Sequence, residues 1–414
     1  MIKIVSQKIL LSILILVSVV GLPVYSQTGQ PPALPERNAI QTAVPFLTIT
    51  PDARAGGMGE VGIACEPDLN SQYWNAAKYP FMESRFGLTL SYTPWLSELI
   101  SKVNLFNFAG FYKIDNYQVI SASFRRYSAD HIFFTNHTGT PQGILVPGEF
   151  AFDAGYSRKL SKSFSGGIVL RFIYSDLTGG QSPGGGESKA AMALAGDLGF
   201  FYRKPVLRLN NLNGILGLGV QVSNVGNKIS YTADQEKAFL PMNLRLGGAF
   251  TIKKGYHHSI SIMSDINKLL VPTPPIWLTS PAGAIVLNPK GQPIVQYGKD
   301  PFVSVPQGMF QSFWDAPGVL QEDGSRSRFQ EELNEIAIGV GVEYWYNGVI
   351  AIRGGYFHEH ESKGSRRYFT VGAGINYKVI SFDGSYLIPT KSQHPLAETY
   401  RLTVSLAFGS TFEN

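Results

Sequence analysis

From Arg85 to the end of the chain, apolar and polar residues alternate in segments of about ten residues, separated by turn residues. This period-2 alternation is typical of β-strands. The last segment is the clearest, because Leu402 and Val404 fall on one face whereas Thr403 and Ser405 fall on the other. We count fourteen such segments, and each has one strongly apolar face and one face of small or polar residues.

Charged residues within these segments fall on the small or polar face, and none lies centrally on the apolar face. They are Arg85, Arg125, Asp153, Arg171, Asp197, Arg245, Asp265, Glu343, Arg353, Asp383 and Arg401. A charge near the midplane of a lipid-facing strand costs about 2 to 4 kcal/mol, whereas a charge in a lumen can pair or stay hydrated. A soluble sandwich also alternates, but its polar face would carry more Lys and Glu. The pattern therefore predicts an all-β fold, a fourteen-stranded antiparallel transmembrane β-barrel over residues 85–409, with these charges in its lumen.

The connections between the segments alternate between short and long, as in barrels with short periplasmic turns and long exterior loops. One short connection is Asn347-Gly348, the pair favoured in type I′ hairpins. Residues 204–213 are the exception, because a short turn is due there and the sequence indicates a longer connection. An even strand number brings both barrel ends to the periplasmic side, so we expect the N-terminal segment to enter from there.

Two regions precede the barrel. Residues 1–26 carry Lys3 and Lys8, an apolar stretch and small residues before Gln27, which predicts a signal peptide cleaved before Gln27. Residues 27–84 are rich in Pro and then in Gly, with almost no period-2 alternation. They predict a linker followed by a plug, or hatch, in or under the lumen.

The longest predicted loop spans residues 266–333 and is rich in Pro. It carries more aromatic and Met side chains than a solvated loop needs: Trp277, Phe302, Met309, Phe310, Phe313 and Trp314. These side chains could pack on one another to cap the barrel. They could also form a partner-binding surface, because aromatic and Met residues are enriched at interface cores. The two interpretations are compatible.

The amino-acid composition and the short motifs limit the functions that this chain can have. Only 16% of the 414 residues are charged, and the net charge of +5 comes without a long Lys/Arg cluster, so no nucleic-acid partner is expected. Residues 57–62 match dinucleotide-binding spacing without the βαβ unit that this motif requires, and Gly184–Gly186 favours a flexible hairpin tip over a phosphate loop. His358–Glu361 clusters metal-ligating residue types without zincin spacing, and Cys65 is a lone cysteine. We therefore expect no catalytic residues, no metal, no cofactor and no enzymatic activity.

Several stretches closely resemble the PorV family of the type IX secretion system. They are residues 51–59, 62–64, 68–79, 90–95, 149–151, 156–158 and 171–177. The resemblance extends over nearly all of the mature chain. One departure is Ala76, where members of the family usually carry Pro. The family is similar in turn to FadL-type fatty-acid transporters, which are fourteen-stranded barrels with an N-terminal hatch.

The resemblance implies an integral outer-membrane protein, in contact with outer-membrane lipid, whose loops lie at the cell surface. It further implies a non-enzymatic cargo shuttle. Such a protein collects secreted proteins with C-terminal signal domains from the SprA translocon and delivers them to PorU and the attachment complex. The plug residues are interpreted as structural, with Arg54 expected to pair with a lumenal carboxylate: Arg54, Gly56, Gly57, Gly59, Asn70, Trp74 and Asn75.

Two other functions remain open at this point. One is FadL-like transport of a hydrophobic small molecule, which predicts a continuous apolar pocket in the lumen. The other is a structural scaffold for the attachment complex, like the related PorQ. The shuttle hypothesis predicts a blocked lumen and apolar loop tips.

Overall fold

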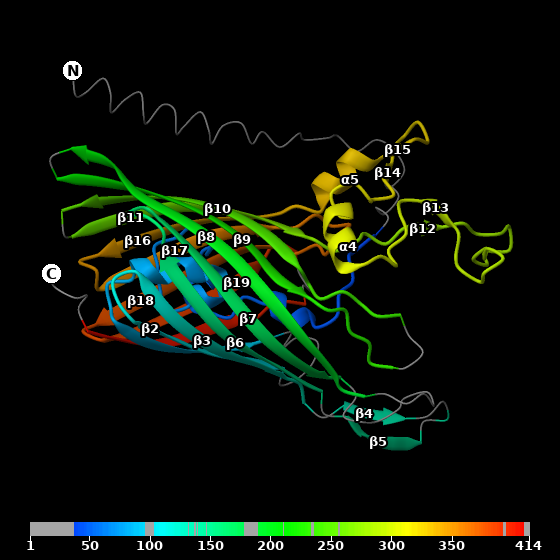
Figure 1. Ribbon diagram of the computed structural model, residues 1–414, viewed down its shortest axis with the longest axis horizontal. Helices are drawn as coiled ribbons and strands as arrows, with labels where there is room; N and C mark the ends of the chain where they lie inside the picture. Colours follow the sequence, from blue (N-terminus) through cyan, green and yellow to red (C-terminus); the bar gives the residue numbers. More distant parts are fainter. Residues whose placement is uncertain are drawn as a thin grey trace. The chain divides into compact units, whose positions relative to one another are not determined.

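The computed structural model describes residues 37–95, 103–130, 132–135, 138, 140–145, 147–177, 189–209, 211–232, 236–255, 257–391 and 395–409 (Figure 1). The expected signal peptide, residues 1–26, and the hairpin tip at Gly184–Gly186 lie outside the described residues.

Fourteen antiparallel strands form a closed barrel, as the alternation predicted. Consecutive barrel strands pair with each other, and β1 pairs with β20 to close the sheet, so the barrel has no free edge. The barrel strands are β1 (Phe86–Pro94), β2 (Asn104–Lys113), β3 (Gln118–Ser128), β6 (Gly148–Lys159), β7 (Phe164–Asp176), β8 (Ala191–Leu209), β9 (Leu212–Gly226), β10 (Asn243–Lys254), β11 (His258–Leu269), β16 (Ala337–Tyr346), β17 (Ile350–His358), β18 (Arg367–Tyr377), β19 (Ile380–Pro389) and β20 (Tyr400–Phe408).

The two faces of the barrel wall differ as the sequence predicted. Leu170 and Leu194 are each 69% exposed on the outer face, whereas Thr403 and Ser405 on β20 are buried on the inner face. The outer wall is therefore a continuous apolar surface of the kind that faces lipid. Among the described residues, no helix is long and apolar enough to cross a membrane.

The short connections lie at one end of the barrel. Asn347 and Gly348 both have positive φ, 53° and 64°, as a type I′ turn requires. The expectation of a long connection at 204–213 is wrong, because β8 and β9 remain paired as far as Leu209 and Leu212. A register shift between Pro205 and Leu207 interrupts the regular alternation and concealed the end of β8 in the sequence.

The plug consists of short helices, with little regular structure between them. These are η1 (Pro45–Thr48), α2 (Ala53–Gly56), α3 (Ser71–Trp74) and η2 (Ala76–Phe81). The expected direction of entry is wrong. The amide of Asn38 donates to Ser362 O and that of Ala43 to Phe239 O, and both acceptors lie in long loops. The chain therefore descends from the long-loop end to the short-turn end, where Phe86 begins β1.

The long loops carry the remaining elements. The loop between β11 and β16 holds β12 (Ile276–Trp277), β13 (Val295–Tyr297), α4 (Val305–Gln311), β14 (Val319–Leu320), β15 (Arg326–Ser327) and α5 (Arg328–Asn334). The hairpin of β4 (Ile132–Thr135) and β5 (Pro141–Leu145) lies beyond the same end of the barrel (Figure 1). The expected loop start at Ile266 is wrong, because β11 continues to Leu269 and the loop begins after it.

The apolar outer wall predicts a depth-dependent cost for a charge. Leu170 lies midway along β7, so Leu170→Arg should destabilise the barrel by about 2 to 4 kcal/mol. Leu209→Arg, at the short-turn end of β8, is the matched control and should cost about 0 to 1 kcal/mol. The free energy of unfolding would be measured by denaturant titration in lipid vesicles. Equal costs at the two positions would contradict a lipid-facing wall.

Candidate functional site

The plug backbone lies directly against glycines of the barrel wall. A Cβ on Gly355 would lie 2.2 Å from the backbone nitrogen of Gly59, and one on Gly341 would lie 2.4 Å from Met58 O. Gly59 itself has a φ of 67°, and a Cβ there would lie 2.6 Å from Val340 O. The small inner face that the sequence shows on these strands is therefore the surface that receives the plug.

Arg54 joins the plug to the wall through a buried ionic cluster. Its Nη2 lies 2.7 Å from Glu343 Oε1, and its Nη1 lies 2.8 Å from Asp68 Oδ2 within the plug. Arg353 lies 2.7 Å from both Glu343 and Asp383. The lumenal carboxylate that the sequence led us to expect as the partner of Arg54 is therefore Glu343. Removing one member of such a cluster leaves a buried charge without its partner.

A second cluster of the expected lumenal charges lies on β3, β6, β7 and β8. Arg171 bridges Asp153 at 2.6 Å and Asp197 at 3.0 Å, while Arg125 approaches Asp153 at 3.6 Å. The Arg125 guanidinium also lies 5.0 Å from the ring centre of Tyr73 in the plug. Wall charges and a plug aromatic residue thus form one packed unit.

Two further contacts fix the plug. Arg401 on β20 forms an ion pair with Glu60 of the plug at 2.8 Å. Asp265 on β11 accepts hydrogen bonds from the backbone amides of Gly62 at 2.7 Å and Ile63 at 2.9 Å. The sequence placed Asp265 on the polar face but gave no sign that it would bind plug backbone.

The other expected plug residues are buried and contact either other parts of the plug or the barrel wall. Trp74 donates from Nε1 to Asp52 at 2.7 Å, and Asp52 also caps α2. Asn75 donates to Phe200 O in β8 at 2.9 Å. The backbone amide of Asn70 donates to the Asp68 side chain at 3.0 Å. Gly56 and Gly57 approach Arg401 and Gly372 of the wall, respectively.

A third ionic cluster, which we call the cap cluster, lies at the long-loop end. Lys268 of β11 pairs with Glu332 at 3.1 Å and with Glu335 at 2.7 Å. Lys363, from the loop between β17 and β18, pairs with Glu331 at 2.7 Å and with Glu335 at 3.1 Å. The cap cluster therefore ties α5 to the barrel rim on two sides.

Asp315 lies buried beside the cap cluster. Its carboxylate accepts a hydrogen bond from the backbone amide of Thr273 at 3.2 Å. Burial, followed by the negative charges of Glu335 and Glu332, raises the pKa of Asp315 to about 7. This carboxyl group therefore changes its charge near neutral pH.

The aromatic side chains of the loop divide into two groups. Met309 packs against the buried cluster of Phe239 and its neighbours, and the ring of Trp277 stacks on Phe302 with centres 6.2 Å apart. The outward group consists of Phe302, Phe310, Phe313 and Trp314, which we call the aromatic surface. These side chains are 43 to 70% exposed, with Phe310 the most exposed.

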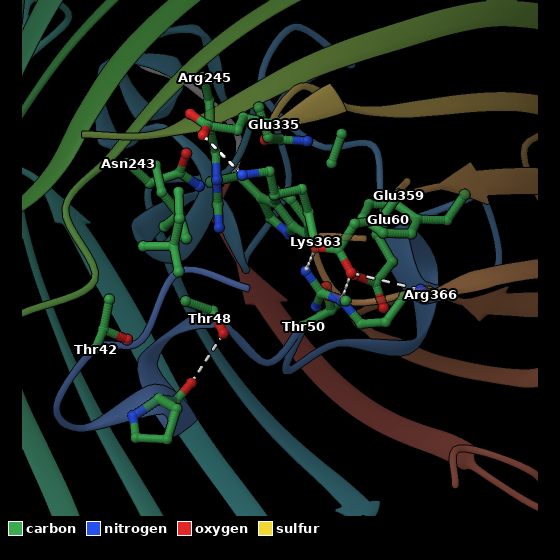
Figure 2. Close-up of a pocket in the computed structure, with 18 residues that line it drawn as sticks. Thr42, Thr48, Thr50, Glu60, Asn243, Arg245, Glu335, Glu359, Lys363 and Arg366 are labelled. Atoms are coloured by element: carbon green, nitrogen blue, oxygen red, sulfur yellow. Dashed lines mark hydrogen bonds and ion pairs between the residues drawn. The ribbon is translucent and has the colours of Figure 1, made fainter. Parts of the chain in front are cut away.

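A cavity of about 260 Å³ lies between the plug and the long loops (Figure 2). Asn243, Leu269, Ala337 and Phe357 line it from the loop ends of four strands. Its charged lining residues are Glu60, Arg245, Glu335, Glu359, Lys363 and Arg366. This lining differs from the apolar route that a transporter of hydrophobic molecules would need.

The His358–Glu361 cluster is engaged by neighbouring protein groups. Glu359 forms an ion pair with Arg366 at 2.8 Å, and His360 Nδ1 lies 2.9 Å from Ser362 Oγ. Burial and the positive charge of Arg367 lower the pKa of His360. In the part of the chain that the structure describes, no group of three or more His, Cys, Asp or Glu side chains could hold a metal ion.

Several residues of these ionic networks gave little signal in the sequence. Lys78, in the plug, is fully buried and donates to Gly62 O at 2.6 Å, and the cap cluster combines Lys268, Lys363 and Glu335 from distant segments. The EELNE run at 331–335 places its first and last Glu four residues apart, on one helix face. It was the only hint of the cap cluster.

A closed barrel with an apolar outer wall and a folded plug in its lumen defines a plugged outer-membrane β-barrel protein. The family model described as "Type IX secretion system protein PorV" matches residues 33–276, which is more than half of the chain. The chain therefore belongs to the PorV family. Among curated proteins, no sequence match is found.

Solved structures with a similar barrel share little sequence with this chain. The Pseudomonas putida toluene transporter TodX is 11% identical, with a TM-score of 0.46, and the match covers 88% of this chain and 99% of TodX. The Ralstonia pickettii toluene transporter TbuX is 10% identical, with a TM-score of 0.44 and coverage of 87% and 98%. A FadL homologue of Pseudomonas aeruginosa is 10% identical, with a TM-score of 0.41 and coverage of 90% and 100%.

The Arg54 cluster predicts that two arginine substitutions differ in how much they lower the free energy of unfolding. Arg54→Gln leaves the buried Glu343 with one partner fewer and should destabilise the plugged barrel by at least about 2 kcal/mol. Arg203→Gln is the control, because Arg203 pairs with Glu66 at 2.9 Å where both side chains are partly exposed, and it should cost about 0 to 1 kcal/mol. Denaturant unfolding of both variants checks the difference. A cost for Arg54→Gln no larger than the control would mean that the cluster does not hold the plug.

The raised pKa of Asp315 predicts that the cap is more stable at low pH. The folded cap keeps its proton up to about pH 7, whereas the unfolded chain loses it near pH 3.8, so cap stability should fall as pH rises between these two values. Limited proteolysis of the loop, measured across this range, should therefore accelerate with pH. Asp315→Asn should flatten the profile, and an unchanged profile in that variant would contradict the assignment.

Proposed function

We propose that this protein is a non-enzymatic carrier in type IX secretion. It binds the C-terminal signal domains of secreted proteins at its long-loop face and shuttles them from the SprA translocon to PorU and the attachment complex. Membership of the PorV family supports a role in this secretion system. In this proposal the long loops face the cell exterior and the short turns face the periplasm.

The single observation that carries the proposal is the aromatic surface. Four large side chains on one loop remain between 43 and 70% exposed, although the same loop packs Met309 against a buried cluster and buries a set of ionic groups. Exposed large apolar side chains concentrated in one short segment, residues 302–314, are of the kind found at protein interaction sites. The cap cluster also supports the surface, because Glu332 accepts a hydrogen bond from the backbone amide of Ala316 at 3.1 Å and the Lys268 ammonium lies 5.7 Å from the ring centre of Phe313. A surface supported before a partner arrives lowers the entropic cost of binding.

The plug supports a carrier over a transporter. Its backbone contacts the wall glycines, and ionic groups join the two at Glu343 and Arg401. The cavity above the plug mixes charged lining residues such as Arg245 and Glu335 with apolar ones such as Leu269, and the charges suit a hydrophobic permeant poorly. A scaffold role would also leave the lumen closed, so cargo binding itself must be measured.

The test compares aromatic substitutions at the two ends of the barrel. The triple variant Phe310→Ala, Phe313→Ala and Trp314→Ala removes exposed rings only, so the barrel should assemble normally. Loss of a hot spot typically costs about 2 kcal/mol or more, so co-purifying cargo should fall at least about tenfold. The control is Tyr117→Ala, an aromatic residue that is 61% exposed at the short-turn end.

Tagged protein would be recovered from native outer membranes in mild detergent, and retained proteins would be quantified by mass spectrometry. Undiminished cargo on the triple variant would overturn the assignment of the aromatic surface. Recovery of translocon and attachment proteins without any cargo would favour a scaffold. Recovery of the barrel alone with a stoichiometric hydrophobic ligand would favour small-molecule transport.

A further inference from the structure

One of the charged side chains that line the cavity in Figure 2, that of Arg245, has no ion-pair partner among the described residues. Arg245 projects from β10 and is only 7% exposed, yet no ion pair joins it to a carboxylate among the described residues. Its Nη2 donates to the hydroxyl of Tyr73 at 3.1 Å, and its Nε has no hydrogen-bond partner. The other expected lumenal arginines, such as Arg171, Arg353 and Arg401, each contact a carboxylate.

The remaining charges around the cavity are already engaged. Glu60 pairs with Arg401, and Glu359 pairs with Arg366. Glu335 and Lys363 belong to the cap cluster. Arg245 is therefore the lining charge available to a ligand within the described part of the chain.

Asp265, a carboxylate on the neighbouring strand β11, forms no ion pair with Arg245 among the described residues. Asp265 lies on β11, two positions along the register from the partner of Arg245. Its Oδ2 accepts the amide hydrogens of Gly62 and Ile63, so this oxygen anchors the plug, whereas Oδ1 has no hydrogen-bond partner. Asp265 lowers the local positive potential without occupying the guanidinium.

Plug aromatic residues hold the guanidinium in position. Its carbon lies 4.9 Å from the ring centre of Tyr73 and 5.1 Å from that of Trp74. Rings that cover the face of a guanidinium stabilise its charge and leave the N–H groups at its edge as donors. The orientation is thus fixed before any ligand enters, as a specific binding site requires.

We propose that this cavity is a binding site for a single carboxylate group, with Arg245 as its cationic donor. A guanidinium matches the planar geometry of a carboxylate. One available positive charge balances one negative charge, whereas a dianion would meet Glu60, Glu335 and Glu359 in the lining. Side chains such as Leu269 and Phe357 offer apolar contact beside the charge.

The cavity volume limits the size of the ligand that bears the carboxylate group. About 260 Å³ lies near the lower end of ligand pockets, so a short free acid or the C-terminal residue of a peptide fits the space. Both present the same chemistry to Arg245. The proposal does not depend on the carrier function, because it rests on the charge and geometry of the cavity alone.

The experiment uses the full mature protein in detergent and isothermal titration calorimetry. The probes are acetyl-alanine, acetyl-alanine amide, and one tetrapeptide with a free or an amidated C-terminus. The free acids should bind at least about tenfold more tightly than the amides, because an amide carries no negative charge and no second acceptor oxygen for the guanidinium. Tighter binding of the free tetrapeptide identifies a chain terminus as the ligand, and equal or tighter binding of the small acid identifies a free acid.

Three variants separate the site from general folding. Arg245→Gln should weaken binding of the free acids at least about tenfold, and Arg245→Lys should restore most of it because the charge is retained. Thr42→Phe, on the plug side of the cavity, should block binding by filling the space without altering the wall. As a control, Arg203→Gln lies outside the cavity lining and should bind as the unsubstituted protein does. Heat-modifiable migration on gels verifies that each barrel is folded.

Equal affinity for acids and amides would overturn the proposal. So would undiminished binding in both Arg245→Gln and Thr42→Phe, or no binding of either free acid at millimolar concentration. If Arg245→Gln fails to fold, Thr42→Phe and the comparison of acid with amide still decide the outcome.

Discussion

The exclusion of charge from the middle of the lipid-facing wall is the constraint on which this structure depends. A charge in the central part of a strand must face the lumen, where it is removed from bulk water and needs a partner. The wall supplies some partners itself, as on β6, β7 and β8, where Arg171 lies between two aspartates. Others come from the plug: Arg401 pairs with Glu60, and Glu343, which already pairs with Arg353 of the wall, also accepts from Arg54. The plug is therefore part of the electrostatic balance of the barrel, in addition to filling its lumen.

Buried charges are also paired at the long-loop end, where the pairs join loop segments to one another. The cap cluster buries Lys268 and Lys363 against three glutamates at α5, and Asn38 near the start of the described chain donates to Glu331 at 2.9 Å. Four segments that are distant in sequence are thus joined by ionic and polar contacts. Pairs of this kind add little net stability, but they are specific in geometry. They hold the loop in one arrangement while its aromatic surface stays exposed.

The sequence predicts those features that depend on neighbouring residues, and it misses those that depend on contacts between distant residues. Strand number, strand faces and lumenal charges are period-2 properties, and β20 displays them directly, with Thr403 on the inner face and Val404 on the outer face. The pattern misled about the ends of two strands: a bulge beside Pro205 shifts the register near the end of β8, and β11 continues to Leu269. By contrast, the pairing of Arg54 with Glu343 joins residues far apart in the chain, and a single sequence carries no local sign of such a contact. The unexpected entry from the long-loop end has a similar cause, because strand parity fixes where β1 begins and says nothing about where the plug begins.

This direction of threading bears on what the lumen can do. The described part of the plug makes contact with the long loops at Asn38, crosses the lumen and reaches the opposite rim, where Met82 O accepts a hydrogen bond from Lys113. The plug is therefore held at both rims and along its length by Arg54 and Asp265. Displacing it would break several buried polar contacts at once, and each would leave a group without its partner. A lumen occupied in this way favours binding at the loops over passage through the barrel, and the small cavity lies above the plug, where residues of the plug, the strand ends and the long loops line it together.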